Sequence, residues 1–106
     1  MQRIKIVVID SLQKIIENSD ARTRKLFEKQ KRFMELKPYY NSLGRTKLRN
    51  VTDQYGNSLW EIRLDGKRRI VFVEKIESNE IKIIWLKICS HDELIRNDII
   101  RINGSY

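Results

Sequence analysis

The sequence predicts a two-layer α+β domain in which two helices pack on one side of an antiparallel sheet. A run of β-branched residues comes first, two segments with helical periodicity follow, and three segments with strand character fill the second half of the chain. Strands that follow one another closely usually pair as antiparallel neighbours, and their apolar face needs a covering layer. The expected element order is β-α-α-β-β-β-α, within one domain that spans residues 1–106.

The N-terminal strand and the first helix are short. Residues 3–9, RIKIVVI, are β-branched and mostly apolar, which predicts a strand of about six residues. Asp10 or Ser11 then caps a helix that extends to about Asn18. The buried side of this helix is expected to carry Leu12, Ile15 and Ile16.

The second helix is amphipathic and has a cationic outer face. We expect it to begin after Ser19 or Asp20 and to run to about Leu36, because Pro38 stops it. Basic residues occupy most of its surface, and its apolar stripe consists of Leu26, Phe27, Phe33 and Met34.

Residues 38–58 join the helices to the sheet. They contain the one proline and two of the four glycines, and they show no sustained period. We expect an ordered connection with a short strand near residues 46–51. A connection of this length in a small domain is usually functional.

Residues 59–72, LWEIRLDGKRRIVF, predict a β-hairpin that turns at Asp65-Gly66. Polarity alternates along it, so Glu61 and Arg63 are expected on the face opposite the apolar residues. The covered face is expected to carry Trp60, Ile62, Leu64, Ile70 and Phe72.

The predicted register of this hairpin places two arginines opposite each other. Keeping the apolar residues together puts Trp60 opposite Phe72, Ile62 opposite Ile70, and Arg63 opposite Arg69. Exposed like charges in this position repel by up to ~1 kcal/mol. The pair is therefore either a solvated face, with Glu61 relieving part of the repulsion, or a site for a phosphate, which two rigidly held guanidinium groups suit. Arg68 is expected on the turn side, in solvent.

The last predicted strand leads to the one histidine. Residues 81–88, IKIIWLKI, predict a central strand that is covered on much of both faces, and Cys89 at its end is expected to be packed. Residues 90–93, SHDE, follow as a turn and N-cap before a short helix from Leu94 to about Ile102. His91 is either structural or exposed, or it exchanges protons as a catalytic residue.

Composition excludes several classes of protein. No apolar run approaches the ~20 residues needed to span a bilayer, and the N-terminal apolar run is too short for a signal peptide, so we expect a cytoplasmic protein. The single cysteine cannot form an intramolecular disulfide. No metal-ligand cluster, phosphate-binding glycine loop or serine hydrolase motif is present, so we expect no metal and no cofactor.

The net charge of +8 is concentrated in one segment. Residues 22–49 contain ten basic residues and two acidic ones, while the other 78 residues carry twelve of each sign. Such an excess indicates either a solvated helix face or a surface for a polyanion, which is a nucleic acid or an acidic protein partner.

The motifs in the second half of the chain resemble the RelE/ParE superfamily of type II toxin–antitoxin toxins, in its RelE-like branch. The resemblance lies in KPYYNSLGRTKL from Lys37, LWEIRLDGKRRIVF from Leu59, the apolar strand, and HDELI from His91. It implies the RelE-like fold, with two helices on one face of a compact sheet and a concave basic surface on the other. It also implies an mRNA interferase, a metal-independent endoribonuclease that cleaves mRNA on the ribosome and so inhibits translation.

The resemblance assigns catalytic residues by position. Arg63 and Arg69 match the two strand arginines that bind the scissile phosphate, and His91 matches a general acid or base in the C-terminal cluster. Glu93 or Glu61 is the implied proton acceptor.

The resemblance also implies binding residues and partners. Lys47 and Arg49 match a basic segment that contacts the RNA backbone, and we add Arg45, Lys29 and Arg32 to the expected RNA-binding residues. The implied partners are a cognate antitoxin, mRNA and the ribosome, with no membrane. The implied assembly is either a homodimer or a toxin–antitoxin heterotetramer.

One position departs from the family pattern and keeps other functions open. The pattern ends in tyrosine, where this chain has Ile95. A ParE-like inhibitor of DNA gyrase shares the fold without ribonuclease chemistry, and a catalytically silent module would only bind RNA or antitoxin. His91 with the paired arginines favours the interferase, whereas Ile95 keeps the silent module open.

Overall fold

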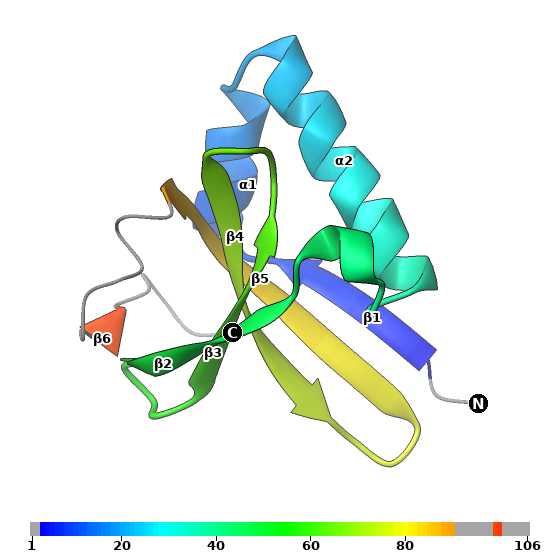
Figure 1. The fold of residues 1–106 in the computed structure, drawn as a ribbon, viewed down its shortest axis with the longest axis vertical. Coiled ribbons are helices and arrows are strands. Elements are labelled where there is room, and N and C mark those ends of the chain that lie inside the picture. The colour runs from blue at the N-terminus through cyan, green and yellow to red at the C-terminus, as the bar shows by residue number, and fades with distance from the viewer. Residues whose placement is uncertain (1–2, 91–98, 101–106) are drawn as a thin grey trace.

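The computed structural model describes residues 3–90 and 99–100. Figure 1 shows α1 and α2 together on one side of the sheet. Neither helix of the described chain is long and apolar enough to cross a bilayer. In chain order the elements are β1 (Arg3–Val8), α1 (Asp10–Glu17), α2 (Ala21–Leu36), the 3₁₀ turn η1 (Asn41–Leu43), β2 (Thr46–Asp53), β3 (Ser58–Arg63), β4 (Arg68–Ile76), β5 (Glu80–Ser90) and β6 (Ile99–Ile100).

The described strands form one mixed sheet in the order β1-β5-β4-β3-β2-β6. The predicted two-layer α+β arrangement and its antiparallel meander are confirmed. Residues 46–53 form a strand of eight residues, so the meander begins at β2 and runs to β5. β1 pairs in parallel with β5. A parallel pair needs a long crossover between its strands, and here the helices and the meander supply it.

The main core lies between the helices and the sheet. Phe27 and Met34 of α2 are buried against Trp85 of β5. The Phe27 ring packs edge-on against Trp85 with centroids 5.0 Å apart, and Trp85 Nε1 donates a hydrogen bond to Met34 Sδ at 3.3 Å. The side chains predicted for the covered face of the hairpin join this core, namely Trp60, Ile62, Leu64, Ile70 and Phe72.

The opposite face of the sheet carries a second cluster of buried side chains, which includes Leu59, Val71, Ile84 and Cys89. β5 contains a β-bulge at Leu86. Val71 pairs with Lys87 and Phe72 pairs with Trp85, so Leu86 has no cross-strand partner in β4. Burial on both faces explains why residues 81–88 are continuously apolar. The predicted packing of Cys89 is confirmed, with 4% of the residue exposed.

The start of α2 is confirmed, whereas the predicted cap of α1 is wrong. Asp20 caps α2 by accepting a hydrogen bond from the Thr23 backbone N–H at 2.7 Å, and this bond lowers the pKa of Asp20. The N-cap position of α1 is Ile9, which forms no side-chain cap. Asp10 is instead the first residue of the helix, where its negative charge interacts favourably with the positive end of the helix dipole.

Two apolar residues assigned to buried helix faces are exposed. Ile15 is 58% exposed and Phe33 is 38% exposed, while Ile16 and Met34, the next residues, are buried. Successive helical residues are rotated by ~100°, so only one member of each apolar pair can point straight at the sheet.

The predicted final helix from Leu94 to Ile102 is wrong where the structure describes it. Ile99–Ile100 form β6, which pairs in parallel with Thr52 and Asp53 of β2. The backbone of these two residues therefore belongs to the sheet. Residues 94–98 and 101–102 lie outside the described residues.

Asp65 organises the turn of the hairpin. Its carboxylate accepts hydrogen bonds from the backbone N–H groups of Lys67 and Arg68, at 2.9 and 2.7 Å, and from the Arg68 guanidinium at 3.0 and 2.8 Å. Arg68 also donates to Thr23 Oγ1 of α2 at 3.2 Å. The expectation that Arg68 is merely solvated is wrong, because its side chain ties the turn to α2. Desolvation raises the pKa of Asp65, but these hydrogen bonds and the charge of Arg68 lower it to about 2.

We expect the Asp65 carboxylate to contribute to stability in a pH-dependent way. Its pKa of about 2 in the folded chain lies below its ordinary value of 3.8. The contribution is therefore fully present above about pH 4 and is lost as the pH falls toward about 2. Asp65→Asn should lower the free energy of unfolding at pH 7 by ~1 kcal/mol. It should also reduce the loss of unfolding free energy between about pH 4 and pH 2.

Urea unfolding between pH 2 and 7, followed by tryptophan fluorescence, measures this effect. Glu35→Gln removes an exposed carboxylate of α2 and serves as the control. If the free energy of unfolding fell as steeply with decreasing pH in Asp65→Asn as in the unmodified chain, Asp65 would not be the group responsible.

Candidate functional site

The β3–β4 hairpin brings Arg63 and Arg69 together. They are direct cross-strand partners, in the register that the sequence predicts. Neighbours along a strand point to alternate faces, so both arginines and Glu61 lie on the face opposite the helices. Cβ atoms of such partners are ~4.5–5.5 Å apart. Two permanent positive charges are thus attached to adjacent points of a rigid sheet.

A glycine gives Arg63 room to lean away from Arg69. The β2–β3 register has Thr46 opposite Glu61, and two further steps along it place Gly44 beside Arg63. Gly44 has a φ of +65°, and a Cβ atom there would lie 2.9–3.1 Å from Nε, Cγ and Cδ of Arg63. The exposed Arg63 side chain therefore lies across the Gly44 backbone. Sequence reasoning missed Gly44, although a lone glycine just before a predicted strand is a signal of close approach.

Arg69 turns toward the hairpin turn and Glu61. Its Nη1 donates to the carbonyl oxygens of Asp65 and Arg68 at 3.1 and 3.2 Å, and its Nε lies 4.0 Å from Glu61 Oε1. The Arg69 side chain is 14% exposed. Arg69 therefore uses part of its donor capacity inside the protein, while Arg63 presents its guanidinium to solvent.

Glu61 is a buried carboxylate with an unused acceptor. Its side chain is 9% exposed, and Oε2 is buried and accepts no hydrogen bond in the described chain. An unsatisfied buried acceptor costs ~1–3 kcal/mol, so native proteins keep one mainly where the group has another role. Within residues 3–90 and 99–100, no three His, Cys, Asp or Glu side chains are grouped in a way that could hold a metal ion.

Lys47 and Arg49 are cations of β2, but Lys47 is opposite Trp60, so its side chain lies on the face of the sheet that carries the main core. Both are exposed, and both line a shallow hollow of about 590 Å³ on that strand. β2 is the neighbour of β3 in the sheet, so this hollow lies one strand from Arg63. The structure thus places these two predicted RNA-binding residues on the strand next to β3, with the side chain of Lys47 on the face opposite Arg63 and Arg69.

Arg45, in contrast, is not a surface cation. Its Nη2 lies 2.5 Å from Glu74 Oε2, and both side chains are 9% exposed. Its guanidinium carbon lies 4.6, 4.5 and 5.1 Å from the ring centroids of Tyr39, Trp60 and Phe72. The structure corrects the expectation of an RNA contact here, because the ion pair and three aromatic rings occupy the charge.

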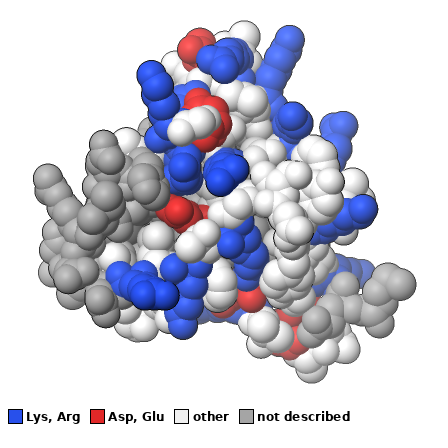
Figure 2. Space-filling view, viewed as in Figure 1, with Lys and Arg blue, Asp and Glu red and all other residues white. Residues whose placement is uncertain are grey.

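Lys29 and Arg32 lie on a separate surface. Both are exposed on α2, which packs on the face of the sheet opposite the arginine side chains. α2 contacts the site through Gln30, whose Nε2 donates to the Arg63 carbonyl oxygen at 2.5 Å. Figure 2 shows Lys and Arg side chains both around the helices and across the centre of the visible face. The exposed cations of the basic segment are therefore divided between α2 and β2.

The end of β5 lies beside the arginine pair. Its last residue, Ser90, is opposite Arg68. His91 and Glu93 follow in the sequence and lie outside the described residues, as does Ile95. Their catalytic roles stay predictions.

Two solved structures share this architecture. A YoeB/ParE toxin from Agrobacterium tumefaciens aligns with a TM-score of 0.62 at 18% identity, over 82% of this chain and 98% of that one. The archaeal RelE–RelB complex from Pyrococcus horikoshii OT3 gives a TM-score of 0.60 at 18% identity, over 85% and 96%. The chain has the RelE/ParE toxin fold. The RelE-like fold that the motifs imply is thereby confirmed, although no family model and no curated protein matches the sequence.

Within this RelE/ParE fold, we expect Gly44 to position the Arg63 side chain. Gly44→Ala should displace Arg63 and weaken binding of a short RNA in the same direction as Arg63→Ala, with a strain of ~1 kcal/mol from the left-handed backbone. Gly56→Ala is the matched control, because Gly56 has a φ of +82° but a Cβ atom there would meet nothing in the described chain within 4 Å.

Fluorescence anisotropy with a labelled RNA and urea unfolding measure the two effects separately. In an Arg63→Ala background, Gly44→Ala should weaken RNA binding no further. Equal RNA affinities of the Gly44→Ala and Gly56→Ala proteins would show that Gly44 does not act through Arg63.

For Arg45 we expect a stability defect. Arg45→Ala leaves the buried Glu74 carboxylate unpaired and should lower the free energy of unfolding by ~3 kcal/mol. Arg49→Ala, at an exposed position of β2, should change stability by less than ~0.5 kcal/mol. Thermal unfolding compares the two variants, and an unchanged melting temperature in Arg45→Ala would refute the buried ion pair.

Proposed function

We propose that this chain is the toxin of a type II toxin–antitoxin system and that it acts in the cytoplasm as an mRNA interferase. It cleaves mRNA on the ribosome without a metal ion and so inhibits translation. The observation that carries the proposal is the cross-strand pair of Arg63 and Arg69 beside the buried Glu61, in a fold shared with RelE and YoeB/ParE toxins.

The proposed reaction is transesterification within the RNA backbone. The ribose 2′-oxygen attacks the adjacent phosphorus, the bond from phosphorus to the 5′-oxygen breaks, and a 2′,3′-cyclic phosphate and a 5′-hydroxyl result. A base removes the proton of the 2′-hydroxyl, and an acid protonates the leaving 5′-oxygen. Negative charge builds on the phosphorane oxygens in between, and nearby fixed cations stabilise it.

The residues divide these tasks by their exposure. Arg63 is exposed and binds a phosphate oxygen, and Arg69 supplies a second charge held firmly by the turn. Glu61, with its free Oε2, or Glu93 accepts a proton, and His91 acts as the general acid or base.

The RNA on either side of the cleaved bond needs further cations. Lys47 and Arg49 suit this role because they are exposed on β2, next to the strand that carries Arg63. Contacts to phosphates position a nucleic acid without reading its sequence. One structural neighbour is a RelE–RelB complex, which supports an antitoxin as the partner of this chain.

A second function is favoured by how Arg69 is held. Two carbonyl oxygens and Glu61 engage its guanidinium, so the pair offers less free donor capacity than two exposed arginines would. Ile95 also replaces the tyrosine of the family pattern. These observations suit a toxin that binds without cutting, and inhibition of DNA gyrase is the activity to test, since one neighbour carries the name YoeB/ParE.

Controlled expression in growing cells, with mapping of mRNA 5′ ends, tests the proposal. We expect discrete cuts within translated codons, and Arg63→Ala should reduce their frequency by about 100-fold because a stabilising charge is lost. Arg63 is exposed, so this variant should keep its stability. Lys67→Ala, an exposed cation of the same hairpin, serves as the matched control.

The other outcomes separate the alternatives. Growth arrest with intact mRNA and double-strand DNA breaks would establish the gyrase function in place of the interferase. Intact mRNA and intact DNA, with normal growth, would leave a silent binding module. Cuts that persist in Arg63→Ala would remove the arginine pair from the mechanism.

A further inference from the structure

The outer side of α2 carries a groove that the proposed cleavage site does not use. Thr23, Phe27 and Met34 of this helix face the protein interior. The residues on the opposite side are exposed, and they line a hollow of about 650 Å³ between their side chains. In the described chain, every residue that lines this hollow belongs to α2.

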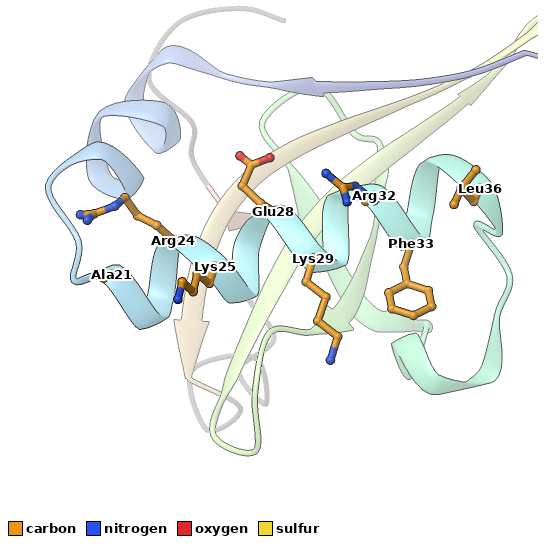
Figure 3. A pocket seen from close by; sticks show the side chains of 8 residues that line it. All are labelled: Ala21, Arg24, Lys25, Glu28, Lys29, Arg32, Phe33 and Leu36. Carbon is orange, nitrogen blue, oxygen red and sulfur yellow. The ribbon is translucent and has the colours of Figure 1, made fainter.

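Two rows of side chains border the groove, each with a spacing of four residues. One row is Ala21, Lys25, Lys29 and Phe33, and the other is Arg24, Glu28, Arg32 and Leu36. Figure 3 shows the side chains of Lys29 and Phe33 directed to one side of the helix, and those of Glu28 and Arg32 to the other. Rows with this spacing are the ridges that bound the grooves of a helix surface. In the commonest class of helix packing, a ridge of a second helix fills such a groove.

The walls of the groove are cationic. Four of its eight lining residues are lysine or arginine, and Glu28 is the one carboxylate among them in the described chain. Arg24 is held at the N-terminal end of the helix, where it donates a hydrogen bond to the Ser19 carbonyl oxygen. An occupant of the groove must therefore supply negative charge along most of its length.

The C-terminal end of the groove is apolar. Leu36 is 75% exposed and Phe33 is 38% exposed. The Phe33 ring stacks parallel to Tyr40, with centroids 5.9 Å apart, so its orientation is fixed. Apolar side chains gain free energy by leaving water for other apolar groups, which a phosphate backbone does not offer. The end of the groove thus favours a protein over a nucleic acid.

We infer that this groove binds an acidic amphipathic helix of a partner protein. A row of apolar side chains, four residues apart, inserts between the two rows of α2, with its largest members against Phe33 and Leu36. Carboxylates that flank this row lie beside Lys25, Lys29 and Arg32. The partner helix crosses α2 at an angle near −50°, with the axes about 8–10 Å apart.

The groove and the arginine pair are on opposite sides of the sheet. α2 packs on one face, and the side chains of Arg63 and Arg69 extend from the other. A helix bound at α2 therefore leaves the arginines accessible, and the inference does not depend on the proposed cleavage activity.

A pair of designed peptides tests the inference on the full chain. The probe is a fluorescein-labelled, alanine-based helix of about 20 residues, with leucine at every fourth position and glutamate on both flanks. Its control carries lysine in place of each glutamate. By fluorescence anisotropy at low salt, we expect the glutamate peptide to bind at least ~10-fold more tightly than the lysine peptide.

Two variants with matched controls localise the binding. Lys25→Glu should weaken binding of the glutamate peptide about 10-fold, whereas Lys5→Glu, at an exposed position of β1, should not. Leu36→Ser should weaken it, whereas Ile76→Ser, which changes another exposed apolar residue, should not. All four positions are exposed, so the variants are expected to fold.

Several outcomes would overturn the inference. One is that the two peptides bind equally, and another is that Lys25→Glu and Lys5→Glu have equal effects. A third is that an RNA hairpin displaces the peptide while Leu36→Ser leaves the binding of that RNA unchanged. The last outcome would make the groove a nucleic-acid surface. Arg63→Ala should bind the glutamate peptide normally, so a failure of the cleavage proposal and a failure of this inference give different results.

Discussion

The register of the β3–β4 hairpin is the constraint on which both the core and the site depend. A slip by one residue would move Ile62 and Ile70 out of the helix-covered core and would turn Glu61, Arg63 and Arg69 into it. Burying those charges among apolar side chains would cost several kcal/mol. The hydrophobic effect that assembles the core thereby also forces the two arginines to face each other. A change of register that separated Arg63 from Arg69 would therefore unfold the protein.

The fold reduces this repulsion in three places. Gly44 has no side chain, so Arg63 can lean across its backbone and away from its partner. Arg69 is drawn toward the carbonyl oxygens of the turn, and Glu61 adds a negative charge 4.0 Å from its Nε. The result is an asymmetric pair, in which one guanidinium is free to meet a ligand and the other is fixed. Such an arrangement combines an exposed contact with a preorganised charge.

The sheet also separates the uses of the positive charge. Arg63 and Arg69 lie on one face of the sheet, and the cations of α2 border a groove on the helical layer. Arg45 pairs with Glu74 and packs against aromatic rings. Arg45 and Glu74 connect the segment after η1 to β4, so that charge stabilises the fold instead of binding a ligand. The sheet therefore separates the arginine pair from the cationic groove of α2.

The sequence by itself determined the features that depend on near neighbours. Period-two alternation around a tight turn predicted the Arg63–Arg69 pairing, and Asp20 indicated the start of α2. Long-range contacts decided the rest. An arginine in a connection looks the same whether it is solvated or paired, and the fate of Arg45 depends on Glu74, 29 residues later. The parallel pairing of β1 with β5 and the approach of Gly44 to Arg63 likewise follow from packing between distant segments. Periodicity is a local property of the chain, whereas burial and charge pairing are set by whichever residues the completed fold brings together.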